Sequence, residues 1–160
     1  MKLVFLDLDN TLIDADYRLA VPEDEFRGVV QELIRKNVRV GLCSDSAVVT
    51  LRQWADRLGL TGPIVAERGA VVWDSARQIE NILDISETAW FREFREAFVI
   101  TIMRNFPGST IMIGDATKFV KNRCVNSALT QEVFAINGFR VASFSFFACH
   151  PSDQLSLEPD

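Results

Sequence analysis

The 160-residue sequence predicts an α/β fold, in which a Rossmann-like parallel sheet is followed by a small α+β lobe. Strand-like and helix-like patterns alternate over residues 1–74, which is typical of a parallel, doubly wound sheet. Beyond residue 74 one long helical pattern precedes shorter segments of mixed type. We therefore expect a core domain over residues 1–74, a second lobe over residues 75–150 and a polar tail over residues 151–160.

The core domain begins with a near-continuous apolar run, KLVFLDL over residues 2–8, as expected of a strand covered on both faces. Apolar residues at helical spacing follow Pro22, which suits a first helical turn, and Asn37 marks the end of this helix. A second strand is predicted over residues 38–43. Strand, helix and strand together form a βαβ unit.

A second helix and a third strand complete the core domain. Ser44-Asp45-Ser46 offers an N-cap to the helix, and Gly59 ends its apolar face. Residues 63–66 form a short apolar run that predicts the third strand.

The second lobe is predicted to mix helices with an antiparallel type of strand. Its expected elements are a helix over residues 86–105 with Trp90, Phe91, Phe94, Phe98 and Ile102 on one side, a strand over residues 110–113, a helix over residues 127–136 and a strand over residues 140–147.

Composition excludes several classes of protein. Lys and Arg total 17 against 22 Asp and Glu, and this net charge of −5 argues against binding to nucleic acid. The apolar runs are too short to span a membrane and no signal peptide is evident, so we expect a cytoplasmic protein. Cys43, Cys124 and Cys149 lack the spacing of a disulfide framework or, with His150, of a zinc site.

Polar residues follow the predicted parallel strands, where the ligand sites of such sheets lie. Asp7 and Asp9 follow the first strand, Ser44 the second and Glu67 the third. Two carboxylates about 4 Å apart repel each other by roughly 4 kcal/mol at an effective dielectric of 20, so such a pair favours a cation or a shared proton. Mg2+ is the natural cation, although an ordinary acidic loop is the alternative.

VFLDLDNTL resembles the first motif, DxDxT, of the haloacid dehalogenase superfamily. The resemblance implies that Asp7 is the nucleophile that attacks phosphorus, and that Asp9 protonates the leaving oxygen and later activates water. Thr11 would stabilise the turn and, with Asn10, lie at the phosphate. Ser44 matches the second motif, whose hydroxyl holds the phosphoryl group. Asp7 and Asp9 would also bind Mg2+.

GPIVAERGAVVWD, over residues 62–74, is similar to the Cof-type and archaeal phosphoglycolate-phosphatase-like branch of that superfamily. In this branch a cap domain follows, which the second lobe would form. Three residues depart from the patterns of the superfamily. Arg68 replaces the usual Asn of this branch, and Asp45 with Ser46 replaces the Gly-Arg or Gly-Asn pair of the sugar-phosphatase branches, so Asp45 and Arg68 are candidate substrate contacts.

The third motif, a Lys or Arg, and the fourth, an acidic GDxxxD-like segment, have no clear match. If the second lobe is a cap, both belong beyond it and the core is truncated. In the alternative, Thr110 to Asp115 is the core strand of the fourth motif, with Asp115 as metal ligand and Arg92 or Arg95 in the third role. A truncated core would expose the edge of the first strand, so we expect a homo-oligomer or a partner that covers it.

The leading functional hypothesis is a Mg2+-dependent phosphomonoesterase that acts on a small phosphorylated metabolite, such as phosphoglycolate or a sugar phosphate. The alternative is a catalytically impaired binding or regulatory module, or a partial chain that needs a partner to complete its site. A receiver domain would place its phosphate-accepting Asp after the third strand, where this chain has Glu67, which disfavours that class.

Overall fold

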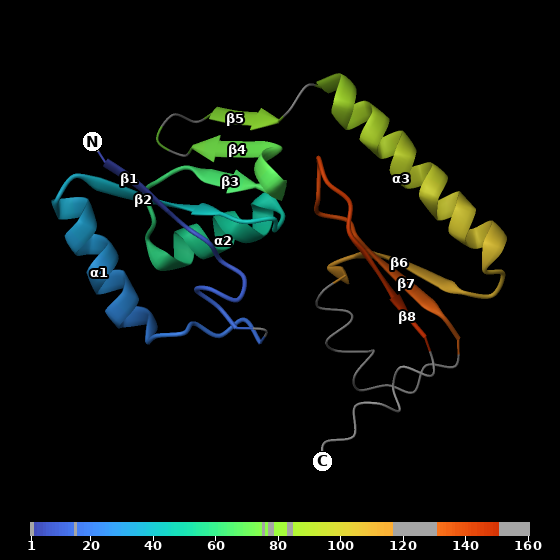
Figure 1. Cartoon of the computed structure of the whole chain (residues 1–160), viewed down its shortest axis with the longest axis horizontal. Coiled ribbons are helices and arrows are strands. Elements are labelled where there is room, and N and C mark those ends of the chain that lie inside the picture. The colour runs from blue at the N-terminus through green and yellow to red at the C-terminus, as the bar shows by residue number, and fades with distance from the viewer. Residues whose placement is uncertain are drawn as a thin grey trace, which may run out of the picture. The chain divides into compact units, whose positions relative to one another are not determined.

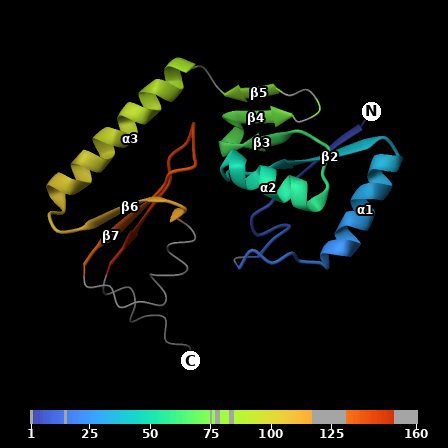
Figure 2. The same ribbon diagram turned by 180° about the vertical axis from the view of Figure 1, so that it is seen from behind.

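The computed structural model describes residues 2–14, 16–74, 76, 79–82, 85–116 and 131–150. The chain divides into two compact units (Figures 1 and 2). The first comprises Met1–Ile85 together with Val141–Ser143, and the second comprises Ser86–Arg140 and Phe144–Asp160. The short segment Val141–Ser143 thus belongs to the first unit although the chain on both sides of it belongs to the second.

A five-stranded sheet forms the centre of the first unit. Its strands lie in sequence order, namely β1 (Lys2–Leu6), β2 (Val38–Cys43), β3 (Ile64–Ala66), β4 (Val71–Asp74) and β5 (Ile79–Ile82). The first three strands are parallel, whereas β4 and β5 are antiparallel to their neighbours. The two helices are α1 (Glu23–Arg35) and α2 (Val48–Leu58). The predicted α/β class with a parallel sheet is confirmed.

Both helices of this unit lie on one face of the sheet, because α1 and α2 contact each other and both contact β2 (Figure 1). Strands β1, β2 and β3 follow one another in a single direction, and right-handed crossovers then place both helices on the same side. The doubly wound arrangement is therefore absent from the described residues. Between helices and sheet lies a core that includes Leu8, Leu42, Leu51, Leu58 and Ile64, all fully buried.

Backbone segments approach closely where the chain enters β3. A Cβ atom added to Gly62 would lie 2.5 Å from the amide nitrogen of Gly41 and 2.5 Å from the carbonyl carbon of Val40. Contacts this short with backbone atoms cannot be relieved by rotating a side chain. Glycine is therefore required at position 62 by the packing of this loop against β2.

Gly62→Ala is expected to lower the free energy of unfolding by about 1–3 kcal/mol, the usual cost of overpacking a tight site. Gly28→Ala is the matched control, because a Cβ there meets no atom within 4 Å and the residue lies inside α1. This control should stabilise the protein by about 0.5–1 kcal/mol, since alanine favours the helix. Urea unfolding measures both values, and equal effects of the two substitutions would contradict the packing argument.

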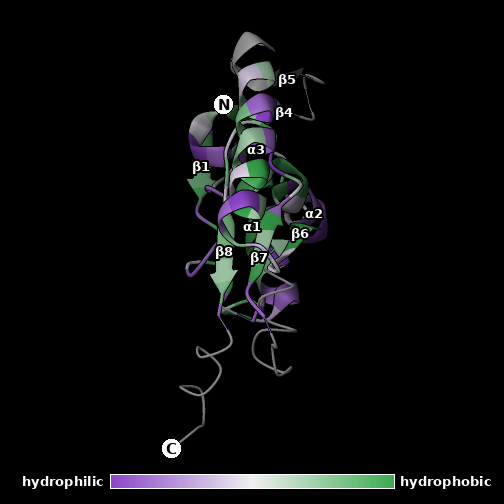
Figure 3. Cartoon of the chain, turned by 90° about the vertical axis from the view of Figure 1, so that its right-hand side faces the viewer, coloured by the Kyte–Doolittle hydropathy of each residue, from purple (hydrophilic) through white to green (hydrophobic). Residues whose placement is uncertain are grey.

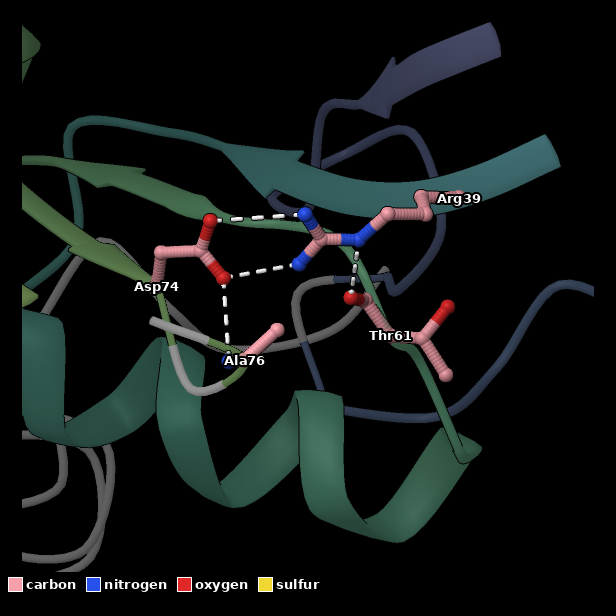
Figure 4. A network of polar contacts seen from close by, with 4 residues as sticks. All are labelled: Arg39, Thr61, Asp74 and Ala76. Atoms are coloured by element: carbon pink, nitrogen blue, oxygen red, sulfur yellow. Dashed lines mark hydrogen bonds and ion pairs between the residues drawn. The ribbon is translucent and has the colours of Figure 1, made fainter. Parts of the chain in front are cut away.

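An ion pair lies at the amino ends of the parallel strands, near the start of β2 (Figure 4). Arg39 donates from Nη2 to Oδ1 of Asp74 at 2.7 Å and from Nη1 to Oδ2 at 3.4 Å. Its Nε donates to the carbonyl oxygen of Thr61 at 2.8 Å, and the amide of Ala76 donates to Asp74 at 3.1 Å. This bidentate, largely buried network links β2 to β4 across β3. It lies away from the carboxyl ends of the parallel strands, where Asp7, Asp9 and Ser44 are found.

β1 is the outermost strand of its sheet, and its arrow is green, the colour of hydrophobic residues (Figure 3). Leu3, Val4 and Phe5 are 44%, 40% and 43% exposed, and residues 2–5 are all exposed. The expectation that this strand is covered on both faces is therefore wrong, because β1 has a neighbouring strand on one side only among the described residues. An unpaired apolar edge of this kind invites pairing with another strand. Coverage of this edge by a second copy or a partner stays a prediction, which light scattering tests because a monodisperse monomer would contradict it.

The second unit contains α3 (Ile85–Asn105) and a sheet of β6 (Thr110–Gly114), β7 (Val133–Asn137) and β8 (Phe146–Cys149). β6 and β7 are parallel, and β8 is antiparallel to β7. The predicted long helix is confirmed. Phe94 and Phe98 of α3 contact the ring of Phe144, whereas Trp90, expected on the same apolar side, is 64% exposed.

Two elements predicted in this unit are wrong. A helix was expected over residues 127–136, but residues 133–136 lie in β7, and residues 127–130 are outside the described ranges. The VFAI segment is buried between β6 and β8, and this tertiary pairing overrides the helical spacing. A strand was expected over residues 140–147, but β8 begins only at Phe146, because Val141–Ser143 belong to the first unit.

The helices in the described ranges include none with the length and apolar character that a membrane crossing requires.

Candidate active site

A tight turn follows β1 and presents the two acidic residues. Leu8, which lies between Asp7 and Asp9, is fully buried in the core. Its carbonyl oxygen accepts hydrogen bonds from the amides of Thr11, Leu12 and Ile13 at 3.4, 3.0 and 3.1 Å. Because Leu8 anchors the turn in the core, the flanking Asp7 and Asp9 are directed away from it, at the carboxyl edge of the sheet. Asp7 is exposed and Asp9 is half-buried.

Two features shape this turn. Asn10 has a φ of 59°, a left-handed conformation that asparagine tolerates better than most residues. The Thr11 hydroxyl donates to Oδ2 of Asp7 at 2.7 Å, which fixes the orientation of that carboxylate. The structure thus brings the predicted nucleophile and the predicted turn-stabilising threonine together. The phosphate contact expected of Asn10 stays a prediction.

Asp9 is held by two serines from the loop after β2. The Ser44 hydroxyl donates to Oδ2 of Asp9 at 2.9 Å, and the Ser46 hydroxyl donates to the same oxygen at 2.8 Å. The amide of Ser46 in turn donates to Oγ of Ser44 at 3.1 Å. The predicted acid/base and the predicted phosphate hydroxyl are therefore in direct contact, and Ser44 is 8% exposed.

Ser46 was missed as a site residue, because Ser44-Asp45-Ser46 reads as a helix N-cap. That N-cap prediction is wrong. α2 begins at Val48, its N-cap is Ala47, and no side chain caps it. The signal that could have found Ser46 is its spacing, since a second hydroxyl two residues after Ser44 lies at the same strand end.

Asp45 and Arg68, the candidate substrate contacts, lie near each other on the surface. Nη2 of Arg68 is 3.9 Å from Oδ2 of Asp45, and the two side chains are 81% and 53% exposed. An exposed pair at this distance adds little stability. Arg68 also has a φ of 61°, a conformation that favours asparagine over arginine. Arg68 offsets part of the charge that Asp45 brings to this edge of the sheet.

Glu67 is the second residue whose role sequence reasoning missed. It is 1% exposed at the end of β3, and its carboxylate accepts hydrogen bonds from three residues. The amide of Val141 donates at 3.1 and 3.2 Å, the amide of Ala142 at 2.8 Å and the Ser143 hydroxyl at 3.1 Å. The amide of Glu67 itself donates to the carbonyl oxygen of Ser46 at 3.2 Å. Glu67 therefore fixes the segment Val141–Ser143 and supports the serine loop.

Asp115 lies directly after β6, and β6 pairs with β7 in the sheet of the second unit. The alternative in which this strand belongs to the core sheet is therefore wrong, because its hydrogen-bonding partner is β7. Arg92 and Arg95 lie on α3. The metal-binding role of Asp115 and the charge-balancing role of the two arginines stay predictions.

The acidic pair fits a Mg2+ site that substrate completes. Within the described ranges, no three His, Cys, Asp or Glu side chains gather in the manner of a self-sufficient metal site. Mg2+ is commonly bound through one or two carboxylates together with substrate phosphate and water. Asp7 and Asp9 offer such carboxylate oxygens. Neither Oδ1 atom accepts a hydrogen bond from the described part of the chain.

A family model for haloacid dehalogenase-like hydrolases matches residues 4–122. The 5-amino-6-(5-phospho-D-ribitylamino)uracil phosphatase of Bacillus subtilis is 29% identical over 75 residues, which cover 47% of this chain and 29% of that protein. The phosphoglycolate phosphatase of Thermoplasma volcanium is 28% identical over 91 residues, which cover 57% of this chain and 39% of that protein. The matches thus span well under half the length of either relative.

Among solved structures, a haloacid dehalogenase-like hydrolase from B. subtilis aligns with a TM-score of 0.43 and 21% identity. The alignment covers 61% of this chain and 34% of that one.

Proposed function

The chain belongs to the haloacid dehalogenase-like hydrolases, and we propose that it is a Mg2+-dependent phosphomonoesterase that works through an aspartyl-phosphate intermediate. The observation that carries this proposal is the arrangement at the end of β1. There, Thr11 holds the carboxylate of Asp7, and Ser44 holds the carboxylate of Asp9. A nucleophile and an acid/base, each oriented by a hydroxyl, are the parts that covalent phosphoryl transfer requires.

In the first step, Oδ1 of Asp7 attacks the phosphorus atom. The bond between phosphorus and the ester oxygen breaks, and Asp9 gives its proton to that leaving oxygen. In the second step, Asp9 takes a proton from water. The resulting hydroxide attacks phosphorus, which releases inorganic phosphate and restores the carboxylate of Asp7.

Charge must be balanced in both steps, because Asp7 and the phosphoryl group are both anionic. Mg2+ would supply positive charge there, held by a carboxylate oxygen of Asp7 together with substrate phosphate, and by Asp9 only in the step in which that carboxylate is unprotonated. The Ser44 hydroxyl lies next to Asp9, and the Ser44 side chain is buried. This hydroxyl would donate a hydrogen bond to a phosphoryl oxygen of the bound substrate.

We propose a small phosphorylated metabolite as substrate, in the class of phosphoglycolate or a sugar phosphate. The names of both curated relatives describe phosphatases of small phosphorylated compounds, which supports this class. Asp45 and Arg68 are exposed at the same edge of the sheet and are candidates for contact with the non-phosphate part of the substrate. The proposed location is the cytoplasm, which cell fractionation tests.

Hydrolysis of p-nitrophenyl phosphate by the 160-residue chain tests the activity. We expect turnover that depends on Mg2+, is lost in excess chelator and returns when Mg2+ is restored. The chelated and reconstituted samples form a matched pair, since they contain the same protein. Absence of turnover at every Mg2+ concentration would contradict the proposal and favour a binding or regulatory module instead.

A further inference from the structure

The two oxygens of the Asp9 carboxylate differ in the number of hydrogen bonds that they accept. Its Oδ2 atom accepts two hydroxyl hydrogen bonds, from Ser44 at 2.9 Å and from Ser46 at 2.8 Å. A carboxylate oxygen has two lone-pair positions, so both positions of Oδ2 are occupied. Oδ1 accepts no hydrogen bond within the described ranges. Oδ1 is therefore the oxygen of Asp9 that is open to a leaving oxygen.

Ser44 cannot hold Asp9 throughout a reaction cycle. Its hydroxyl has a single proton, which it donates to Asp9 in this structure, while its oxygen accepts the amide of Ser46 at 3.1 Å. Once that proton turns to a phosphoryl oxygen, Asp9 loses one of its two donors. Ser46 then supplies the only remaining hydroxyl on Oδ2 from the described residues.

Ser46 is well placed to keep this contact, because its backbone is held on both sides. Its amide donates to Oγ of Ser44, and its carbonyl oxygen accepts the amide of Glu67 at 3.2 Å. Glu67 is buried, so the end of β3 fixes the position of Ser46. The hydroxyl of Ser46 has no capping role, since Ala47 is the N-cap of α2.

We propose that Ser46 is a positioning residue for Asp9. Its hydroxyl keeps Oδ2 occupied after Ser44 has turned to the phosphoryl group, so that Oδ1 faces the leaving oxygen. In the proton transfer, the Oδ1–H bond breaks and an O–H bond forms on the leaving group, which keeps the electron pair of its broken bond to phosphorus. This inference rests on the proposed phosphatase function.

Two substrates that differ only in their leaving group test this role. Phenolate is a much more basic leaving group than p-nitrophenolate, so phenyl phosphate depends more on proton donation by Asp9. We expect Ser46→Ala to lower kcat/KM for phenyl phosphate about tenfold more than for p-nitrophenyl phosphate. The ratio kcat/KM reports the first phosphoryl transfer, in which Asp9 acts as the acid.

Ser46→Thr is the matched variant, because it keeps a hydroxyl at the same position. It should recover at least half of the wild-type kcat/KM for both substrates, and thermal unfolding should show that both variants are folded. Equal losses on the two substrates in Ser46→Ala, or no recovery in Ser46→Thr when that variant is folded, would overturn the positioning role and leave the phosphatase proposal intact. An inactive wild-type chain would overturn both.

Discussion

Asp7→Asn is expected to remove the Mg2+-dependent hydrolysis of p-nitrophenyl phosphate almost completely, by a factor of about 10^4 or more. The amide of asparagine cannot form the phosphoryl bond that a carboxylate oxygen forms. The substitution preserves shape, and the amide oxygen can still accept the Thr11 hydroxyl that now bonds Asp7 at 2.7 Å. The loss should therefore appear in kcat with little change in stability.

Asp24→Asn is the matched control for this experiment. It makes the same chemical change at an exposed position in the first turn of α1. Activity should stay within about twofold of wild type, as is usual for a surface substitution away from the site. Phosphorylated protein trapped by acid quenching gives a second measurement, since it should form with the wild type and with Asp24→Asn only. Residual activity of Asp7→Asn close to wild type would eliminate the proposed nucleophile.

Glu67→Ala is expected to lower the free energy of unfolding by roughly 2–4 kcal/mol, because it removes a buried carboxylate that accepts several hydrogen bonds. The Glu67 side chain is 1% exposed and accepts hydrogen bonds from the amides of Val141 and Ala142 and from the Ser143 hydroxyl. Without the carboxylate the amides of Val141 and Ala142 lose this acceptor, and a lost hydrogen bond to a charged group costs about 1.5–3 kcal/mol. Glu67→Gln keeps one acceptor oxygen and should lose about half as much.

Amide hydrogen exchange shows which residues are destabilised by Glu67→Ala, in addition to how much stability is lost. In Glu67→Ala, the amides of Val141 and Ala142 should lose protection more than those of β2 and β3 do. Uniform loss of protection across the first unit, or none at all, would contradict the assigned contacts. Such a result would also weaken the case that Glu67 supports the loop of Ser46, since the Glu67 amide donates to the Ser46 carbonyl oxygen.

Glu32→Gln is the control for the loss of a glutamate charge. The Lys36 ammonium hydrogen-bonds the Glu32 carboxylate at 2.6 Å and lowers its pKa, but both side chains are exposed. A lowered pKa contributes stability at neutral pH that is lost as the pH falls through that lowered value. Because solvent screens this pair, Glu32→Gln should leave the unfolding curve nearly unchanged at pH 7. A loss of unfolding free energy comparable to that in Glu67→Gln would show that the effect of Glu67 does not depend on its burial.

The sequence alone determined the helices, strands and turns that are formed by interactions between residues close together in the chain. The apolar run of β1, the helical spacing of α1 and the glycine that ends α2 all predicted elements that the structure confirms. The acidic pair and Thr11 were also found without a structure, because their spacing places them in one turn directly after an apolar strand. A pattern within a few residues suffices when the interactions that form the element lie within those same residues.

Tertiary structure alone decided the features that depend on distant partners. Residues 133–136 have helical spacing but form β7, because β6 and β8 pair with them on both sides. Ser46 reads as part of a helix cap, yet its hydroxyl binds a carboxylate 37 positions earlier in the chain. Glu67 reads as one more acid at a strand end, yet its partners lie 74 to 76 positions later. Such contacts leave no trace in the local pattern, since folding brings the partners together only after each local element has been chosen.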